Sequence, residues 1–416
     1  MSIGQTSCMP KIIIIGAGIQ GLSVALALAA RGIDSTILES QPNAMRGASF
    51  GNEGKIHLGF VYALDQSYQT GQEMLRGAHS FAPLLDSWCG PLPWHEWRSS
   101  GFRYAVMPGS LASPDELENY YEQLRIRIPE SLESLPVRPS YFGQDISWMW
   151  ERARTHTGSP FVNGHFAPCF DTEEISIDVR MFSDALLKKV NDSPHIALCT
   201  NSRVNTAKRS GNTFTLDLES CCKMNTIDAD IVINCAWMDR ARLDRLVSGE
   251  TQQDSCLSYR IKHGVIVRPR TSHSLRPVTM VQGPYGDVTP FKDGTVFLSW
   301  YPECRTYFNQ SPPTSELDDT RTLGEIASRT LNKMSEMFPD LENAEIVSCK
   351  PGIIVAEGSS DVDDPGSKLH QRAISGPSGG NGWWSVDTGK LTLAPLHAHT
   401  TVQLILKELS IGKTAA

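Results

Sequence analysis

Residues 11–21 read KIIIIGAGIQG and decide the fold, because they place a glycine-rich turn between an apolar run and a periodic one. The four isoleucines Ile12–Ile15 are typical of a central parallel strand that is buried on both faces. Leucine and alanine residues then recur at three- and four-residue spacing, which predicts a helix over 19–31. A second strand is expected at 35–39. These segments together predict one βαβ unit.

The turn of this unit has the glycine spacing of a dinucleotide site, with Gly16, Gly18 and Gly21 in a Gly-x-Gly-x-x-Gly pattern. The first glycine makes the tight bend, the second lets the backbone approach a pyrophosphate, and the third lets helix and strand pack closely. The helix start offers free N–H donors and a positive partial charge. Glu39, at the end of the second strand, is placed to accept hydrogen bonds from ribose hydroxyls and to repel a 2′-phosphate. The unit therefore predicts a dinucleotide other than NADP.

The chain then enters a loop of small residues, RGASFGNEGKIHLG at 46–59, instead of the strands and helices that complete an NAD-binding sheet. The loop and the βαβ unit resemble the D-amino-acid-oxidase-like superfamily of FAD-dependent oxidoreductases. Three later segments are similar to the same family: Arg203-Val204, expected between two strands; ADIVINCAW at 229–237; and GGNGWW at 379–384 with GKLT at 389–392. The resemblance runs from end to end and is strongest at 11–62 and 376–408.

The resemblance implies FAD as the cofactor and assigns its contacts residue by residue. The residues expected to bind FAD are Gly16, Gly18, Ile19, Gln20, Gly21, Glu39, Ser40, Arg46, Ala48, Ser49, Asn52, Glu53, Gly54, Lys55, Val204, Cys235, Ala236, Trp237, Gly380, Gly389, Lys390, Leu391 and Thr392. A terminal helix is expected from Leu393, with Thr392 as its N-cap. Its N-terminus and Lys390 are placed to stabilise the anion formed when the flavin is reduced.

The order of the segments predicts an α/β fold (α+β overall) with two domains. The Rossmann-like FAD-binding domain is expected to comprise 1–62, 175–245 and 345–416. An inserted antiparallel-sheet domain, 63–174 with 246–344, is expected to bind the substrate. The motivation is that parallel βαβ patterns occur in three separated blocks, while 257–301 alternates apolar and polar residues as an antiparallel sheet does.

Three functions are compatible with this reading. The first is oxidation of a small amine or amino acid at its C–N bond by hydride transfer to flavin N5, with O2 or a quinone or carrier as the final acceptor. The second is a 2-hydroxy-acid dehydrogenase that passes electrons to a quinone or carrier, which the His-containing loop 52–59 slightly favours. The third is a non-catalytic flavoprotein. The sequence has neither a second glycine fingerprint for NAD(P)H nor the Gly-Asp-Ala-x-His segment of the related aromatic hydroxylases.

Candidate catalytic residues are His57, Arg260 and Arg305. His57 follows the nucleotide unit closely and is expected beside the flavin, either as the group that takes a proton from the substrate or as the site of a covalent link to the flavin; a purely structural role is equally compatible. A small acid needs an arginine for its carboxylate, because a guanidinium binds it with two parallel hydrogen bonds. Arg260 and Arg305 are the candidates for that contact.

Charge and composition limit the remaining classes. The chain has 38 Lys+Arg against 46 Asp+Glu, a formal charge of −8, which disfavours nucleic acid as a partner. No apolar stretch approaches the roughly 20 residues that span a bilayer, and the first residues lack the layout of a secretory signal. The ten cysteines contain no Cys-x-x-Cys pair, so no metal site and no disulfide framework are expected. We expect a cytoplasmic protein.

Overall fold

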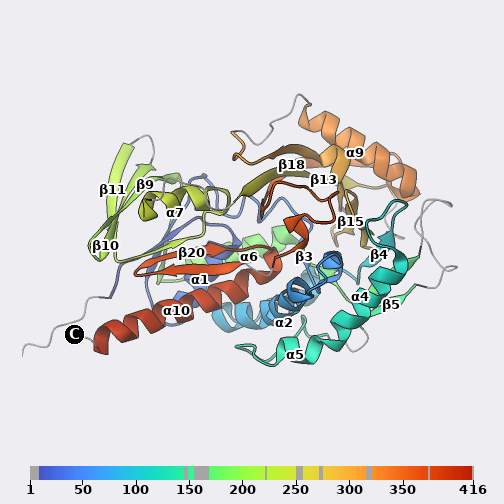
Figure 1. The fold of residues 1–416 in the computed structure, drawn as a ribbon. Coiled ribbons are helices and arrows are strands. Elements are labelled where there is room, and N and C mark those ends of the chain that lie inside the picture. The colour runs from blue at the N-terminus through green and yellow to red at the C-terminus, as the bar shows by residue number, and fades with distance from the viewer. Residues whose placement is uncertain are drawn as a thin grey trace, which may run out of the picture.

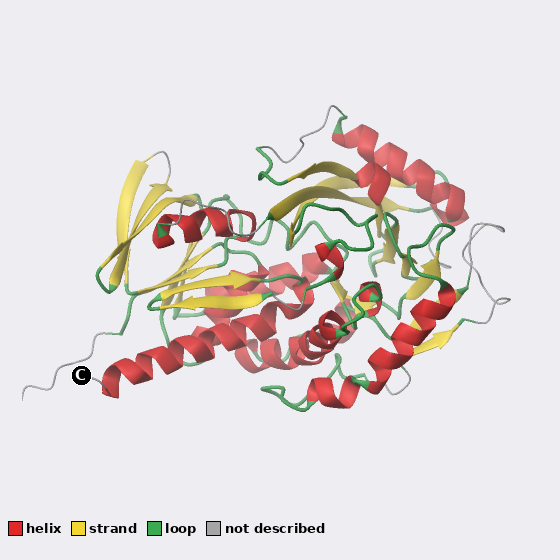
Figure 2. Ribbon diagram, in the orientation of Figure 1, coloured by secondary structure: helices red, strands yellow, loops and turns green. Residues whose placement is uncertain are grey.

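The computed structural model describes residues 9–144, 149–153, 168–220, 223–249, 256–270, 275–314, 321–372 and 375–414. Its helices are α1 (Ile19–Ala29), α2 (Gln69–Cys89), α3 (Trp94–Trp97), α4 (Pro114–Ile126), α5 (Ile128–Leu132), α6 (Val179–Asp192), α7 (Arg240–Ser248), α8 (Tyr301–Cys304), α9 (Leu323–Met337) and α10 (Ala394–Thr414). Short 3-10 turns are η1 (Phe60–Tyr62), η2 (Trp237–Asp239), η3 (Pro339–Leu341), η4 (Lys368–His370) and η5 (Leu391–Leu393). Figure 2 shows the strands gathered in two regions of the molecule, with helices packed around them.

One sheet is formed by segments far apart in the sequence. It has the order β19 (Gly376–Gly380), β20 (Trp383–Asp387), β12 (Ile231–Asn234), β1 (Ile12–Ile15), β2 (Ser35–Leu38) and β8 (Ile196–Cys199). From β20 to β8 all neighbours are parallel, and only β19 pairs in the antiparallel sense. The apolar run at the start of the chain is thus the middle of this sheet, as predicted.

Both faces of β1 are covered, which explains why four isoleucines occur in a row. Ile12 and Ile14 belong to the core that also contains apolar residues of α1 and α10, two helices that pack against each other. Ile13 and Ile15 belong to a second core with Phe214 and other residues of a three-stranded antiparallel sheet. Because successive strand residues point to opposite faces, a strand covered on both faces needs apolar residues throughout.

That three-stranded sheet consists of β9 (Ser202–Ser210), β10 (Thr213–Ser220) and β11 (Lys223–Ala229) and lies at the left of Figure 1. A two-stranded pair, β3 (Lys55–Ile56) with β7 (Ile175–Ser176), follows the nucleotide unit. The segment Arg203-Val204 lies inside β9, so its expected place between two strands is wrong.

The largest sheet is mixed and not purely antiparallel as predicted. Its order is β17 (Arg305–Asn309), β13 (Leu257–Arg268), β16 (Val296–Trp300), β15 (Gly286–Pro290), β14 (Val278–Val281), β4 (Arg103–Val106), β6 (Cys169–Thr172) and β5 (Trp150–Arg152), with β18 (Glu345–Glu357) paired to β13. The pair β4–β14 is parallel and all other neighbours are antiparallel. The α9 helix packs on β16 and β18.

The α/β class with a Rossmann-like parallel sheet is confirmed. The division into two domains stays a prediction, and one of its boundaries differs from the sheet pairing: β18, which was expected in the FAD-binding domain, pairs along β13 in the mixed sheet. The reason is that a strand's partners are set by tertiary contacts and not by its own residues.

The N-termini of three helices show how their first backbone N–H groups are capped. Helices α4 and α9 begin with capping boxes, in which Ser113 pairs with Glu116 and Thr322 pairs with Glu325. The predicted N-cap at Thr392 is wrong, because Thr392 lies within η5 and α10 begins at Ala394. In the described part of the chain, no helix is long and apolar enough to span a membrane and no cluster of His, Cys, Asp or Glu could hold a metal ion.

Candidate active site

The glycines of the nucleotide turn are required by close backbone contacts. A Cβ on Gly16, whose φ is 98°, would lie 2.7 Å from the Cys235 carbonyl oxygen, and one on Gly21 would lie 1.9 Å from the Gly16 carbonyl oxygen. At Gly18 a Cβ would meet only the Ser49 hydroxyl, at 3.1 Å. Gly18 is also the N-cap of α1 and has no side chain to cap it. The helix start therefore faces a space that the protein itself does not fill.

Two side chains fix the walls of this space. Glu39 accepts hydrogen bonds from the N–H groups of Ala17 at 2.7 Å and Gln41 at 2.8 Å, which ties the end of β2 to the turn. The Ser49 hydroxyl accepts a hydrogen bond from the Ile19 N–H at 2.9 Å and anchors the small-residue loop to α1.

A cavity of about 720 Å³ extends from this turn to the mixed sheet. Of the residues predicted to bind FAD, those that line it are Gly16, Gly18, Ile19, Gln20, Glu39, Ser40, Arg46, Ala48, Ser49, Asn52, Glu53, Lys55, Val204, Cys235, Ala236, Trp237, Gly389, Lys390 and Leu391. His57 lines it as well. The cavity therefore joins residues from β1, β2, β9, the segment after β12 and the segment before α10.

Four predicted cofactor residues do not line the cavity. Gly21 packs on Gly16, and Gly54 packs against the backbone of Ile177, where a Cβ would be 1.9 Å from the carbonyl oxygen. Gly380 is in the edge strand β19. Thr392 lies behind the cavity wall, and its hydroxyl accepts a hydrogen bond from the His57 N–H at 2.9 Å.

The opposite wall consists of residues that the sequence reading missed. They are Lys262 and His263 of β13, Phe297 of β16, Ile353 and Ile354 of β18, and Arg372. No local motif marks them, because the strand residues reach the cavity through pairing in the mixed sheet, and Arg372 reaches it from the loop after η4. The alternation of apolar and polar residues in β13 was the one available signal, and it does not say which face meets the cavity.

The environment of His57 is buried and charged. Its Nδ1 is 3.6 Å from Oε1 of Glu174, a residue with no exposed surface. Burial lowers the pKa of His57, while Glu174 acts to raise it. For Glu174, burial raises the pKa, but His57 and Lys55 outweigh burial and hold it below its ordinary value. The pair is thus a neutral imidazole beside a carboxylate at neutral pH.

Lys55 is held away from the cavity centre by a second buried carboxylate. Its Nζ donates to the Thr279 hydroxyl at 2.5 Å and to Asp287 at 2.7 Å, and Nζ of Lys262 is 3.7 Å from the same aspartate. Burial acts to lower the pKa of Lys55, but Asp287, Glu53 and Glu174 outweigh it and raise the pKa. Lys55 therefore stays charged at neutral pH, and its ion pair with Asp287 stabilises the cavity wall.

Arg372 and Lys390 differ from Lys55, because no carboxylate pairs with them among the described residues. Arg372 is 6% exposed, its Nη1 donates to the Val355 carbonyl at 2.9 Å, and its Nε has no hydrogen-bond partner. Burial and the nearby Arg372 lower the pKa of Lys390 to about 8. Two cationic side chains at one place, one with an unsatisfied donor, favour an anionic ligand.

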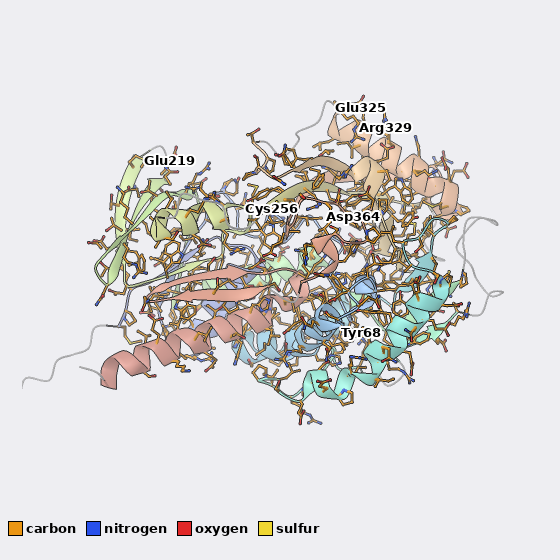
Figure 3. All side chains as sticks on the ribbon, viewed as in Figure 1. Tyr68, Glu219, Cys256, Glu325, Arg329 and Asp364 are labelled. Atoms are coloured by element: carbon orange, nitrogen blue, oxygen red, sulfur yellow. The ribbon has the colours of Figure 1, made fainter. Side chains whose placement is uncertain are left out.

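Arg260 and Arg305 are not brought to the cavity. Arg260 is fully buried and donates to Asp361 and to the Ser360 carbonyl, both at 2.6 Å. Arg305 pairs with the other oxygen of Asp361. Both guanidinium groups are thus bound to the same carboxylate, and they hold the loop between β18 and η4, where Asp364 is labelled in Figure 3. Arg372, which follows η4, does line the cavity, as do Arg46, Arg203 and Arg242.

Trp383 and Trp384, which had no assigned role, are structural. The Trp383 indole N–H donates to Asp244 at 2.9 Å and its ring packs on Phe214, so it joins β20 to α7 and to the three-stranded sheet. Trp384 points to the opposite face of β20 and belongs to the core beneath α10.

Comparison with known proteins places this site in a family. Residues 11–404 match the DAO family, described as FAD dependent oxidoreductase. D-amino acid dehydrogenase 3 of Mesorhizobium japonicum is 48% identical over 48 residues, which cover 12% of this chain and 12% of that relative's length. The curated relative is thus matched over a small part of its length.

Two solved structures are similar over nearly the whole chain. Glycine oxidase from Geobacillus kaustophilus has a TM-score of 0.70 at 16% identity, over 96% of this chain and 95% of that one. L-alpha-glycerophosphate oxidase from Mycoplasma pneumoniae, with FAD bound, has a TM-score of 0.66 at 17% identity, over 95% of this chain and 94% of that one. At these identities the likeness is one of fold.

The residues present fit FAD. The start of α1, whose N-cap Gly18 has no side chain and lines the cavity, suits a pyrophosphate, and Glu39 at the end of β2 suits the adenosine ribose. The cavity wall also includes Arg372, which has no paired carboxylate among the described residues, and the segment Gly389–Leu391. With the match across residues 11–404, the chain belongs to the DAO family of FAD-dependent oxidoreductases.

Proposed function

We propose that the protein oxidises a small amino acid or a carboxylate-bearing amine at its C–N bond. The observation that carries the proposal is that the two cations Arg372 and Lys390 line the same cavity as His57 and lie near it. Lys390 acts electrostatically on His57, and Arg372 acts on Lys390, so the three groups are neighbours. The amino-acid substrates named for D-amino acid dehydrogenase 3 and glycine oxidase support the same class.

Each group has a defined part in this reaction. Arg372 and Lys390 bind the substrate carboxylate, which fixes the carbon that carries the nitrogen. His57 takes a proton from the substrate ammonium, because only the free amine has the lone pair that forms the C=N bond. Bound FAD supplies the acceptor for the hydride that leaves carbon. The product is an imine, and water converts it to a carbonyl compound and ammonia or an amine.

A 2-hydroxy acid is the second candidate, and His57 itself favours it. A hydroxyl group is a far weaker acid than an ammonium, so its oxidation depends more strongly on a positioned base. L-alpha-glycerophosphate oxidase, whose fold this chain shares, is named for an alcohol substrate. The same carboxylate contacts at Arg372 and Lys390 serve a hydroxy acid equally well.

The test is anaerobic bleaching of the bound flavin by separate panels of D- and L-amino acids, N-substituted glycines and 2-hydroxy acids. We expect an amino acid to bleach the flavin and its decarboxylated analogue to fail. Arg372→Lys and Lys390→Met should raise KM for that substrate, whereas Lys407→Met, which changes an exposed lysine of α10, should not. Bleaching by hydroxy acids alone would favour the second candidate, and no bleaching by any compound would favour a non-catalytic flavoprotein.

The electron acceptor is tested with the reduced enzyme. Rapid reoxidation by air with release of peroxide identifies an oxidase, and reoxidation by a quinone analogue alone identifies a dehydrogenase. We propose only these two classes of acceptor, because either one can reoxidise the flavin after the substrate has been oxidised.

A further inference from the structure

We infer that Glu174 is a positioning residue that fixes His57 with Nδ1–H toward the Glu174 carboxylate and with the lone pair of Nε2 toward the cavity. The inference rests on the proposed function for its catalytic consequence, since His57 is the proton acceptor there. Its structural part concerns only residues of this chain and can be measured without a substrate.

Glu174 is held rigidly and has no exposed surface. It lies in the short connection between β6 and β7, far from His57 in sequence but beside it in space. Its Oε2 accepts the Leu58 N–H at 2.6 Å, and its Oε1 accepts the Tyr104 hydroxyl. Because both oxygens have a protein donor, the carboxylate cannot rotate away from the ring of His57.

The backbone and ring of His57 are fixed from three sides. Glu174 binds the N–H of the next residue, Leu58, and the Thr392 hydroxyl binds the N–H of His57 itself at 2.9 Å. The ring meets Tyr62 edge-on, with centroids 5.9 Å apart. The remaining polar atom on the protein side is Nδ1, which is buried and has no hydrogen-bond partner at its present position.

The unsatisfied Nδ1 and the Glu174 carboxylate are 3.6 Å apart, a few tenths of an ångström beyond hydrogen-bond distance. Catalytic hydrogen bonds are often long in ligand-free structures and shorten when the site is filled. A small rotation of the ring toward Glu174 satisfies the buried nitrogen. Of the two ring nitrogens, only Nδ1 is buried without a partner, and His57 lines the cavity, so we assign the cavity-facing edge to Nε2.

The charges around His57 decide its protonation. Lys55 from β3, Lys390 from the segment before η5 and Glu174 face it, and Tyr62 packs on the ring. Burial, Lys390 and Lys55 lower the pKa of His57, and Glu174 raises it. Lys55 also helps to keep Glu174 ionised. A neutral imidazole carries one N–H, and a fixed carboxylate favours that proton on Nδ1.

The consequence for the reaction is a base that is oriented before the substrate binds. The substrate ammonium or hydroxyl gives its proton to Nε2, and the imidazolium that forms donates Nδ1–H to Glu174. The positive charge is then balanced by the carboxylate while the hydride leaves for the bound cofactor. Glu174 itself exchanges no proton, so its part is orientation and electrostatic stabilisation.

The first experiment reads the tautomer by 15N NMR of histidine-labelled holoenzyme, with the His57 signals assigned by their loss in His57→Gln. We expect the Nδ1–H tautomer in the wild type. In Glu174→Gln we expect a mixture of tautomers and a lower pKa of His57, because the group that raised it is gone. Glu173→Gln, the same change at the half-buried neighbour, should leave the His57 signals unchanged. An Nε2–H tautomer in the wild type would overturn the inference without any variant.

The second experiment measures anaerobic flavin reduction across pH with a substrate from the screen. Glu174→Gln should reduce the rate roughly 10–100-fold and move the acid limb of the profile to lower pH, and Glu174→Asp should restore part of both. If the Glu174→Gln variant keeps both the wild-type acid limb of its pH profile and the wild-type 15N signals of His57, the role of Glu174 is rejected. If no substrate reduces the wild-type flavin, the proposed function fails, and the NMR result still decides the orientation of His57.

Discussion

At the scale of single residues, we expect Gly18 to be the glycine that the cofactor requires, whereas the chain itself requires Gly16 and Gly21. Gly16 and Gly21 cannot carry a side chain, because backbone atoms stand within 2.7 and 1.9 Å of their Cβ positions. At Gly18 only the Ser49 hydroxyl is near. Gly18→Val should therefore fold but purify without flavin colour, since the new side chain occupies the place of the pyrophosphate.

Flavin absorbance per chain measures this outcome, and circular dichroism checks the fold. Gly324→Ala, at an open position in α9, is the control that should keep full flavin content. A folded Gly18→Val protein with wild-type flavin content would remove Gly18 from the cofactor site.

His57 is the residue whose loss should affect chemistry more than binding. We expect His57→Ala to keep FAD and to reduce the rate of anaerobic flavin reduction by about 10²-fold or more, with loss of the acid limb of the pH profile. The effect should be smaller for an amine than for a hydroxy acid, because a free amine is already present as pH rises. His57→Gln controls for the volume of the ring, and an unchanged rate in both variants would exclude the base role.

At the scale of elements, α10 carries a histidine that makes the fold acid-sensitive. His397 is 7% exposed, its Nε2 lies 3.2 Å from the Ser375 hydroxyl, and burial lowers its pKa to about 4. The unfolded chain takes up this proton near pH 6.5 and the folded chain only near pH 4. Its contribution to stability is therefore complete above pH 6.5 and decreases as the pH falls toward 4.

This predicts a difference that denaturant unfolding can measure. Between pH 7.5 and pH 5 the wild type should lose about 2 kcal/mol more than His397→Gln, since the variant has no proton to take up there. His95→Gln, at an exposed position, should behave as the wild type. Equal losses in the wild type and His397→Gln would contradict the assignment.

At the scale of the whole molecule, the cofactor site joins distant parts of the chain. The cavity is lined by residues near 16–20, 202–204, 235–239, 352–354 and 388–391. A ligand that binds only this assembled site stabilises the folded state by mass action. We expect removal of FAD to lower the melting temperature, and a concentration of FAD 100-fold above Kd to restore about 2.7 kcal/mol.

Thermal unfolding of apoprotein with increasing FAD measures the effect, and Gly18→Val should show no response to FAD. A melting temperature that does not depend on FAD in the wild-type apoprotein would mean that the site is not assembled on folding. The predicted domain division can be followed in the same experiment, because a two-domain protein would show FAD-dependent and FAD-independent transitions.

The sequence alone determined those elements of this protein that are specified by residues close together in the chain. The βαβ unit follows from the isoleucine run, the glycine spacing and the helix period, and the helices α4 and α9 follow from their period and their capping boxes. These features depend on residues within a few positions of one another. The glycines of the turn follow for the same reason, whereas the predicted cofactor residues of the loop 46–55 came from the resemblance to a family.

Only the tertiary structure decided which charged side chains line the cavity near His57. Arg260 and Arg305 have the right side chain for a carboxylate, but Asp361, 101 and 56 residues away, binds both of them. Arg372 and Glu174 have no motif of their own, and they reach His57 and Lys390 through strand pairings and loop contacts between distant segments. The sequence specifies which side chains are charged, but long-range packing decides which partner each of them has. That partner determines whether the charge is available to a ligand.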